Sequence, residues 1–127
     1  MPNHKAKILL VEDEKSLSEM YQAKLIKEGF EVISVDNGEG VPQVADTAKA
    51  DLILLDIILP KEDGFAALKD LKENSKTKKI PVIMLTNLGQ DEDIKKGKQL
   101  GADLYLVKSN LTPAQVVDKI KGILKIK

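Results

Sequence analysis

Five short apolar runs alternate along the chain with segments whose apolar residues recur at helical spacing. The runs are rich in Leu, Ile and Val and are bounded by turn residues, which is typical of strands buried on both faces of a parallel sheet. Alternation of such strands with helices predicts an α/β fold with right-handed crossovers and helices on both faces of the sheet. The predicted strands are Lys7–Val11, Glu31–Val35, the run within 51–60 that ends at Asp56, Pro81–Leu85 and Asp103–Val107.

The segments between the runs carry recognisable helix signals. In the first, Leu17, Met20, Tyr21 and Leu25 have the spacing of one apolar helix face, and Gly29 stands at a C′ position. The last predicted helix begins with Thr112, Pro113 and Gln115, which form a capping-box pattern. We therefore predict five helices, which begin near residues 15, 41, 64, 91 and 113.

Composition limits what the protein can be. With 127 residues the chain is long enough for one domain and too short for two, so we predict a single domain over 1–127 with an ordered core at about 6–126 and a leader at 1–5. Net charge is zero, and all 20 basic residues are lysines. Because arginine is the usual reader of phosphates and bases, we expect no direct binding to nucleic acid. The sequence has no cysteine, membrane span or signal peptide, which favours a cytoplasmic protein.

Polar side chains stand where the predicted strands end. Glu12 and Asp13 follow the first strand, and Asp56 ends the third. Thr86 ends the fourth and Lys108 follows the fifth. Because the carboxyl ends of parallel strands share one edge of the sheet, where open α/β sheets place their ligands, we expect these five side chains to converge.

Three converging carboxylates need a counter-charge. A pair of like charges 4 Å apart costs about 4 kcal/mol at an effective dielectric of 20, and Lys108 supplies only one positive charge. A hard divalent cation such as Mg²⁺ would supply the rest, and Asp56 would then be a nucleophile toward a phosphoryl donor. The simpler interpretation is a salt-bridged edge, in which Lys108 pairs with Asp56 and the other two acids cap the first helix. The joint placement of all five residues favours the reactive site.

These residues lie in segments that resemble the receiver domain of response regulators, the phosphorylation module of two-component signalling. The resemblance covers nearly the whole chain and implies a flavodoxin-like (βα)5 fold: a five-stranded parallel sheet, doubly wound, with helices on both faces. The matching segments are Ile8–Asp13, Asp51–Asp56, Leu59-Pro60 with Asp63-Gly64, Val82–Thr86 and Gly101–Lys108.

The resemblance implies a function as a phosphoacceptor switch rather than an enzyme with its own substrate, one that catalyses only its own phosphorylation and dephosphorylation. Asp56 would accept a phosphoryl group from a phosphohistidine. Asp13 and Asp56 would bind Mg²⁺, or Mn²⁺, directly. The backbone carbonyl of Ile58 would be a further ligand, and Glu12 would bind through a water molecule.

The resemblance also implies how the signal leaves the site. Thr86, Lys108 and Asn87 would contact the phosphoryl group. Thr86 and Tyr105 match the family's switch pair, in which the hydroxyl moves toward the phosphoryl group and the aromatic ring turns inward. The surface of the fourth helix, fifth strand and fifth helix would then change and control a partner.

Two kinds of partner follow from the resemblance. A histidine kinase or a histidine phosphotransfer domain would donate the phosphoryl group, and a downstream effector protein would receive the signal. The donor would dock near the first helix, where Leu17 and Met20 are either contacts for it or part of the core.

Three departures from the family pattern bear on the chemistry. Ser109 replaces the usual proline after Lys108, and because a cis bond costs about 2.5–4 kcal/mol before a non-proline residue, we expect a trans peptide there. Asn87 replaces a small residue, so its side chain would either crowd the phosphoryl group or donate to it. Ile58 and Leu88 are apolar where many relatives are polar, which predicts slow loss of the phosphoryl group.

Two other functions remain open at this point. A degenerate receiver would bind partners without phosphorylation; Ser109 and Asn87 favour it, and the five polar strand-end residues argue against it. A phosphatase with an aspartyl-phosphate intermediate of the haloacid-dehalogenase type would need an aspartate two residues after Asp56. Ile58 stands there instead.

Overall fold

The computed structural model describes residues 5–126, so residues 1–4 of the predicted leader lie outside the described residues. Five parallel strands form one sheet in the order β2-β1-β3-β4-β5, which places β3 at its centre. The strands are β1 Lys7–Val11, β2 Glu31–Val35, β3 Leu52–Leu55, β4 Val82–Thr86 and β5 Leu104–Val107. The helices are α1 Lys15–Lys27, α2 Val41–Ala48, α3 Gly64–Glu73, α4 Asp91–Gln99, the short 3₁₀ helix η1 Lys108–Asn110 and α5 Pro113–Leu124.

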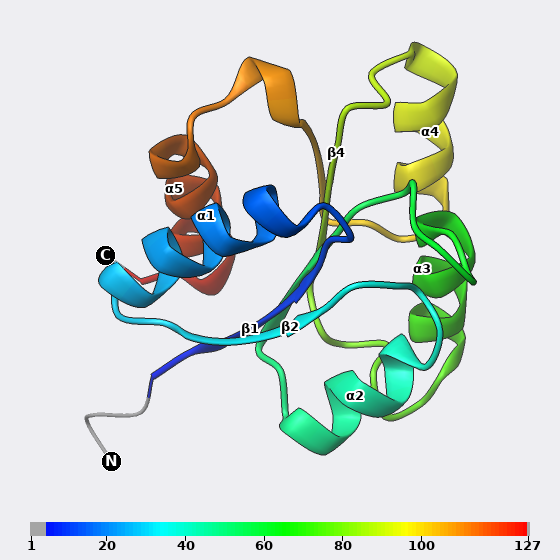
Figure 1. The fold of residues 1–127 in the computed structure, drawn as a ribbon. Coiled ribbons are helices and arrows are strands. Elements are labelled where there is room, and N and C mark those ends of the chain that lie inside the picture. Colours follow the sequence, from blue (N-terminus) through cyan, green and yellow to red (C-terminus); the bar gives the residue numbers. More distant parts are fainter. Residues whose placement is uncertain (1–4, 127) are drawn as a thin grey trace.

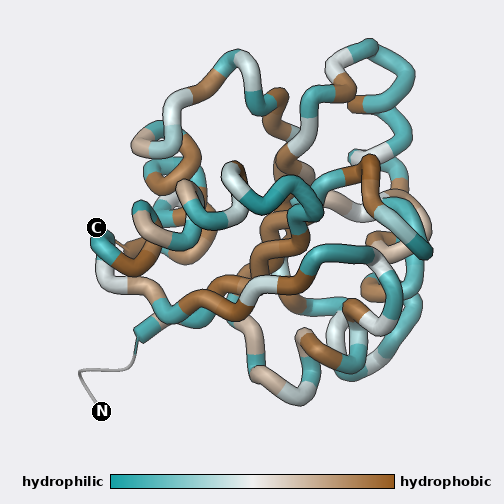
Figure 2. Tube along the Cα trace, in the orientation of Figure 1, coloured by the Kyte–Doolittle hydropathy of each residue, from teal (hydrophilic) through white to brown (hydrophobic). Residues whose placement is uncertain are grey.

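The helices cover both faces of the sheet. In Figure 1, α1 and α5 lie together against one face, whereas α2, α3 and α4 lie against the other. Each face has its own apolar core, because alternate residues of the central strands point to opposite sides. Hydrophobic residues are concentrated in the strands, and the outward faces of the helices are mostly hydrophilic (Figure 2). The predicted three-layer fold is therefore confirmed.

The helix signals in the sequence have the expected structural roles. The Thr112 hydroxyl accepts a hydrogen bond from the backbone N–H of Gln115, whose side chain accepts one from the Thr112 N–H, so the capping box is present. Gly29 follows α1 with a φ of 97°, a conformation that costs glycine little. The strand bounds differ from the predicted ones by about a residue. Within the described residues, none of the helices is both long and apolar enough to cross a membrane.

The apolar side chains of α1 differ in burial. Tyr21 and Leu25 are buried against α5 and the sheet, and Leu17 is partly buried beside them. Met20 has the spacing of the same apolar face but is 41% exposed, so its interpretation as a core residue is wrong and its role as a contact for the phosphoryl donor stays a prediction. Helical spacing brings it near that face, but it lies beyond the width of the stripe that the sheet and α5 cover.

Candidate functional site

Asp56 stands at the carboxyl end of the central strand, directly after β3. Its backbone N–H donates to the Val11 carbonyl over 3.1 Å, which continues the pairing of β3 with β1 beyond the last strand residue. Its Oδ1 accepts a 2.7 Å hydrogen bond from the N–H of Ile57. The residue is only 6% exposed, so its carboxylate is held in a fixed orientation at the edge of the core.

Lys108 supplies the positive charge beside this carboxylate. It is the first residue of η1, directly after β5, and its Nζ donates to Asp56 Oδ2 over 2.7 Å and to Glu12 Oε1. Burial lowers the pKa of the Lys108 ammonium, but the hydrogen bonds to the two carboxylates outweigh burial and raise it above its ordinary value. The described residues contain no cis peptide bond, so the Lys108–Ser109 bond is trans, as expected.

The three predicted acids do converge. One carboxylate oxygen from each of Glu12, Asp13 and Asp56 lies within 4.8 Å of the others. Glu12 is 3% exposed, and its second oxygen accepts a 3.0 Å hydrogen bond from the N–H of Glu14, whereas Asp13 is exposed to solvent. Hard oxygen donors, one of them open to solvent, are the ligands that Mg²⁺ prefers, and the three negative charges exceed the single positive charge of Lys108. The residues therefore fit a divalent cation.

A cavity of about 260 Å³ opens over these groups. Thr86 is fully buried at its base, and its hydroxyl oxygen accepts a 3.4 Å hydrogen bond from the N–H of Leu88. Asn87 is exposed, and Ile58 is 62% exposed. The cavity is lined by Glu12, Asp13, Glu14, Leu17, Asp56, Ile58, Thr86, Asn87, Leu88 and Lys108, which include every predicted site residue except Tyr105.

Tyr105 reaches the site indirectly. Its hydroxyl donates a hydrogen bond to the backbone carbonyl of Leu88, two residues after Thr86. The Tyr105 side chain is partly buried, and this burial raises the pKa of its phenol to about 12. The negative charges of Asp93 and Asp56 add to this effect. The aromatic residue is therefore connected to the cavity through the β4–α4 loop.

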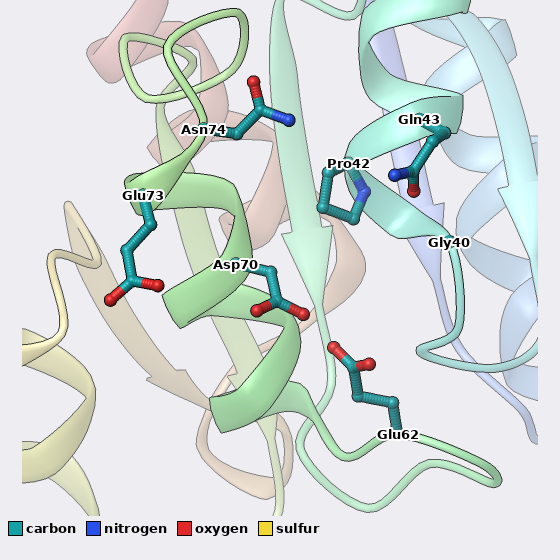
Figure 3. Close-up of a pocket in the computed structure, with 7 residues that line it drawn as sticks. All are labelled: Gly40, Pro42, Gln43, Glu62, Asp70, Glu73 and Asn74. Carbon is teal, nitrogen blue, oxygen red and sulfur yellow. The ribbon is translucent and has the colours of Figure 1, made fainter.

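The chain has a larger hollow of about 500 Å³ that is lined by none of the predicted site residues. Figure 3 shows Glu62, from the β3–α3 loop, with its carboxyl group directed toward Asp70 of α3. A hydrogen bond with Asp70 and then burial raise the pKa of Glu62 to about 7. The buried Oε2 of Glu62 has no hydrogen-bond partner among the described residues. This carboxyl pair is a proton-binding feature separate from the strand-end cluster.

Two polar features of the structure were not predicted from the sequence. Glu14 is the N-cap of α1, where its carboxylate accepts from the N–H groups of Ser16 and Leu17, and it also lines the cavity. Its negative charge just before a helical pattern was a sign of a helix N-terminus, although glutamate is not among the preferred N-cap residues. The meeting of Glu62 with Asp70 had no comparable signal, because it depends on the path of an irregular loop.

Comparison with known proteins identifies a family model and several similar proteins that match most of the chain. The family model of the response regulator receiver domain matches residues 8–121. The alkaline phosphatase synthesis transcriptional regulatory protein PhoP of Bacillus subtilis is 39% identical over 119 residues, which are 94% of this chain and 48% of that protein. The phosphate regulon transcriptional regulatory protein PhoB of Escherichia coli is 37% identical over 94% of this chain and 52% of its own length. The chain thus spans about half the length of these relatives.

Solved structures agree with this match. The chemotaxis protein CheY4 of Vibrio cholerae superposes with a TM-score of 0.85 at 30% sequence identity, and the match covers 93% of this chain and 98% of that one. The receiver domain of RstA from Klebsiella pneumoniae, solved in a BeF3-activated form, gives a TM-score of 0.84 at 30% identity over 91% of this chain and 95% of that one.

Proposed function

The chain belongs to the response regulator receiver domain family of two-component systems, and from this premise we propose that it is a phosphoacceptor switch whose acceptor is Asp56. The observation that carries the proposal is the position of Asp56. Its carboxylate is held by Ile57 and Lys108 at the end of the central strand, beside two further carboxylates and beneath a solvent-accessible cavity.

The proposed reaction is transfer of a phosphoryl group from a phosphohistidine of a histidine kinase or a histidine phosphotransfer domain. An Asp56 carboxylate oxygen forms a bond to phosphorus as the phosphorus–nitrogen bond breaks. The imidazole leaves with the bonding electron pair and takes up a proton from solvent. Lys108, already hydrogen-bonded to Asp56, orients the carboxylate and then pairs with the added negative charge.

Asp13, Asp56 and the backbone carbonyl of Ile58 are the proposed direct ligands of Mg²⁺ or Mn²⁺, with Glu12 acting through water. A cation held by these residues would supply positive charge that offsets the carboxylates and the oxygens of the incoming phosphoryl group. In the structure both oxygens of Glu12 already accept hydrogen bonds, from Lys108 and from the N–H of Glu14. This supports an outer role for Glu12 and leaves the exposed Asp13 as the more accessible ligand.

Thr86 is the proposed sensor of the phosphoryl group. Its hydroxyl oxygen accepts from the Leu88 N–H and keeps its own proton to donate to a phosphoryl oxygen. Asn87 is a further proposed contact of the same group, and its position in the lining of the cavity supports this role. Movement of Thr86 would shift Leu88 and, through the Leu88 carbonyl, Tyr105, so that the α4–β5–α5 surface changes toward a downstream effector.

Intact mass spectrometry after incubation with acetyl phosphate and Mg²⁺ tests this function. We expect wild-type protein to gain the mass of one phosphoryl group, and Asp56→Asn and a chelator-treated sample to gain none. Asp51→Asn is a matched control, because Asp51 lies at the other end of β3, away from the cavity. Its carboxylate accepts a hydrogen bond from the backbone N–H of Lys7. Absence of the adduct from wild-type protein that binds Mg²⁺ would refute the proposal and favour a module that binds partners without phosphorylation.

A further inference from the structure

Gly97 is the one buried residue of α4, and the ring of Tyr105 lies against it. A Cβ atom added to Gly97 would lie 2.8 Å from Cδ2 and 3.1 Å from Cε2 of the Tyr105 ring. Real Cβ atoms essentially never approach a neighbour as closely as the first of these distances. The ring therefore occupies a slot in α4 that exists only because residue 97 has no side chain.

The backbone of Gly97 gives no other reason for glycine. Its φ is not among the positive values of the described residues, and it lies in the interior of a regular helix. Glycine weakens a helix interior relative to alanine, because it loses more conformational freedom on folding. At this position close contact with the aromatic ring is the physical explanation for glycine.

The far end of the ring is also fixed. The Tyr105 hydroxyl donates to the Leu88 carbonyl, while the Leu88 N–H donates to the Thr86 hydroxyl oxygen. Leu88 is thus held through its N–H by Thr86 and through its carbonyl by Tyr105. A continuous set of contacts runs from Thr86 at the base of the cavity, through Leu88 and Tyr105, to the backbone of α4 at Gly97.

We propose that Gly97 is the positioning residue for Tyr105: its slot keeps the ring under α4, with the hydroxyl on the Leu88 carbonyl, in the unmodified chain. The slot thereby couples the β4–α4 loop to α4. The coupling rests on the proposed function only in taking Thr86 as the sensor, since the position of the ring is a property of the unmodified protein.

Gly97→Ala tests the slot, and Gly122→Ala is a matched control. Gly122 also lies inside a helix, α5, but a Cβ added there would meet nothing within 4 Å. In urea denaturation without Mg²⁺ or phosphoryl donor, we expect Gly122→Ala to raise the unfolding midpoint because alanine favours the helix, and Gly97→Ala to lower it. In a Tyr105→Ala background the clash is absent, so Gly97→Ala should then raise the midpoint.

NMR separates positioning from mere stability. The wild type should show an NOE between the Tyr105 ring and the Gly97 Hα protons. Gly97→Ala should shift the Tyr105 ring resonances, whereas Gly122→Ala should leave them in place. With Mg²⁺ and beryllofluoride as a phosphoryl mimic, the amides around Asp56 should respond in both variants, but the response of α4 should be lost in Gly97→Ala alone.

Three results would overturn the inference: no NOE between Tyr105 and Gly97, a rise in midpoint for Gly97→Ala equal to that for Gly122→Ala, or an α4 response that Gly97→Ala leaves unchanged. Failure of the proposed function would appear differently. The NOE and the midpoints would stand, but beryllofluoride would change the amides neither around Asp56 nor in α4 of the wild type.

Discussion

Replacement of Lys108 by methionine removes the positive charge that contacts the buried carboxylates of Glu12 and Asp56. Methionine keeps much of the length and apolar volume of the lysine stem, so the change acts mainly on charge. One oxygen of each carboxylate lies within 4.8 Å of the other. At an effective dielectric of 20, that separation corresponds to a repulsion of about 3.5 kcal/mol.

The known cost of breaking a buried ion pair is similar to this repulsion energy. Removing one partner of a buried ion pair costs about 3–5 kcal/mol, because the remaining charge stays desolvated. We therefore expect Lys108→Met to lower the free energy of unfolding by roughly 3–4 kcal/mol at pH 8 in the presence of a chelator. A domain with the usual stability of about 5–15 kcal/mol would remain folded under these conditions.

Added Mg²⁺ should reverse much of this loss. In the wild type, Lys108 competes with a cation for the same carboxylates, whereas in Lys108→Met the acids attract it without that competitor. The variant should consequently gain more stability from Mg²⁺ than the wild type does. Urea denaturation followed by circular dichroism, with and without Mg²⁺, measures both effects.

Lys119→Met serves as the control for this experiment, because Lys119 is exposed on α5 and a substitution there should change stability by at most about 0.5 kcal/mol. Equal losses in Lys108→Met and Lys119→Met would refute the reasoning. So would a gain from Mg²⁺ in Lys108→Met that is no greater than in the wild type.

Two further predictions concern the loop after β3. Because the folded-state pKa of Glu62 is raised from 4.5 to about 7, the protonated Glu62–Asp70 pair stabilises the fold below pH 4.5, and this contribution is lost as the pH rises through 7. Glu62→Gln should remove that decline between pH 5 and pH 8 in urea denaturation; an unchanged pH profile would contradict the assignment. Ile58, exposed at the cavity, should help exclude water from an acyl phosphate, so Ile58→Asn should shorten the lifetime of the phosphoryl group. A wild-type half-life of seconds with Mg²⁺ would contradict slow dephosphorylation.

The sequence predicted the fold and the convergence of the site because both follow from local pattern. Apolar strands that alternate with helices favour one common topology, a parallel sheet with right-handed crossovers. That topology brings the carboxyl ends of all strands to one edge of the sheet. Asp56 and Lys108 could thus be paired across 52 residues without coordinates, and the structure places them 2.7 Å apart. The spacing of Thr112, Pro113 and Gln115 likewise fixed the start of α5.

What the sequence could not provide depends on packing between elements. Met20 has the spacing of a core residue, but the width of the covered stripe on α1 decides its exposure. The slot at Gly97 requires that α4 and β5 approach each other at one particular separation. The contact between Glu62 and Asp70 requires a particular path of the β3–α3 loop. None of these features leaves a periodic signal in the sequence.

The central claim is that Asp56 itself accepts the phosphoryl group, and chemical mapping tests it most directly. The protein is first incubated with acetyl phosphate and Mg²⁺ and then treated with borohydride, which reduces an acyl phosphate to the alcohol. Its peptides are then analysed by tandem mass spectrometry. We expect homoserine at position 56 and aspartate still present at positions 13 and 51. Homoserine at another acidic position, with an unmodified Asp56, would contradict it.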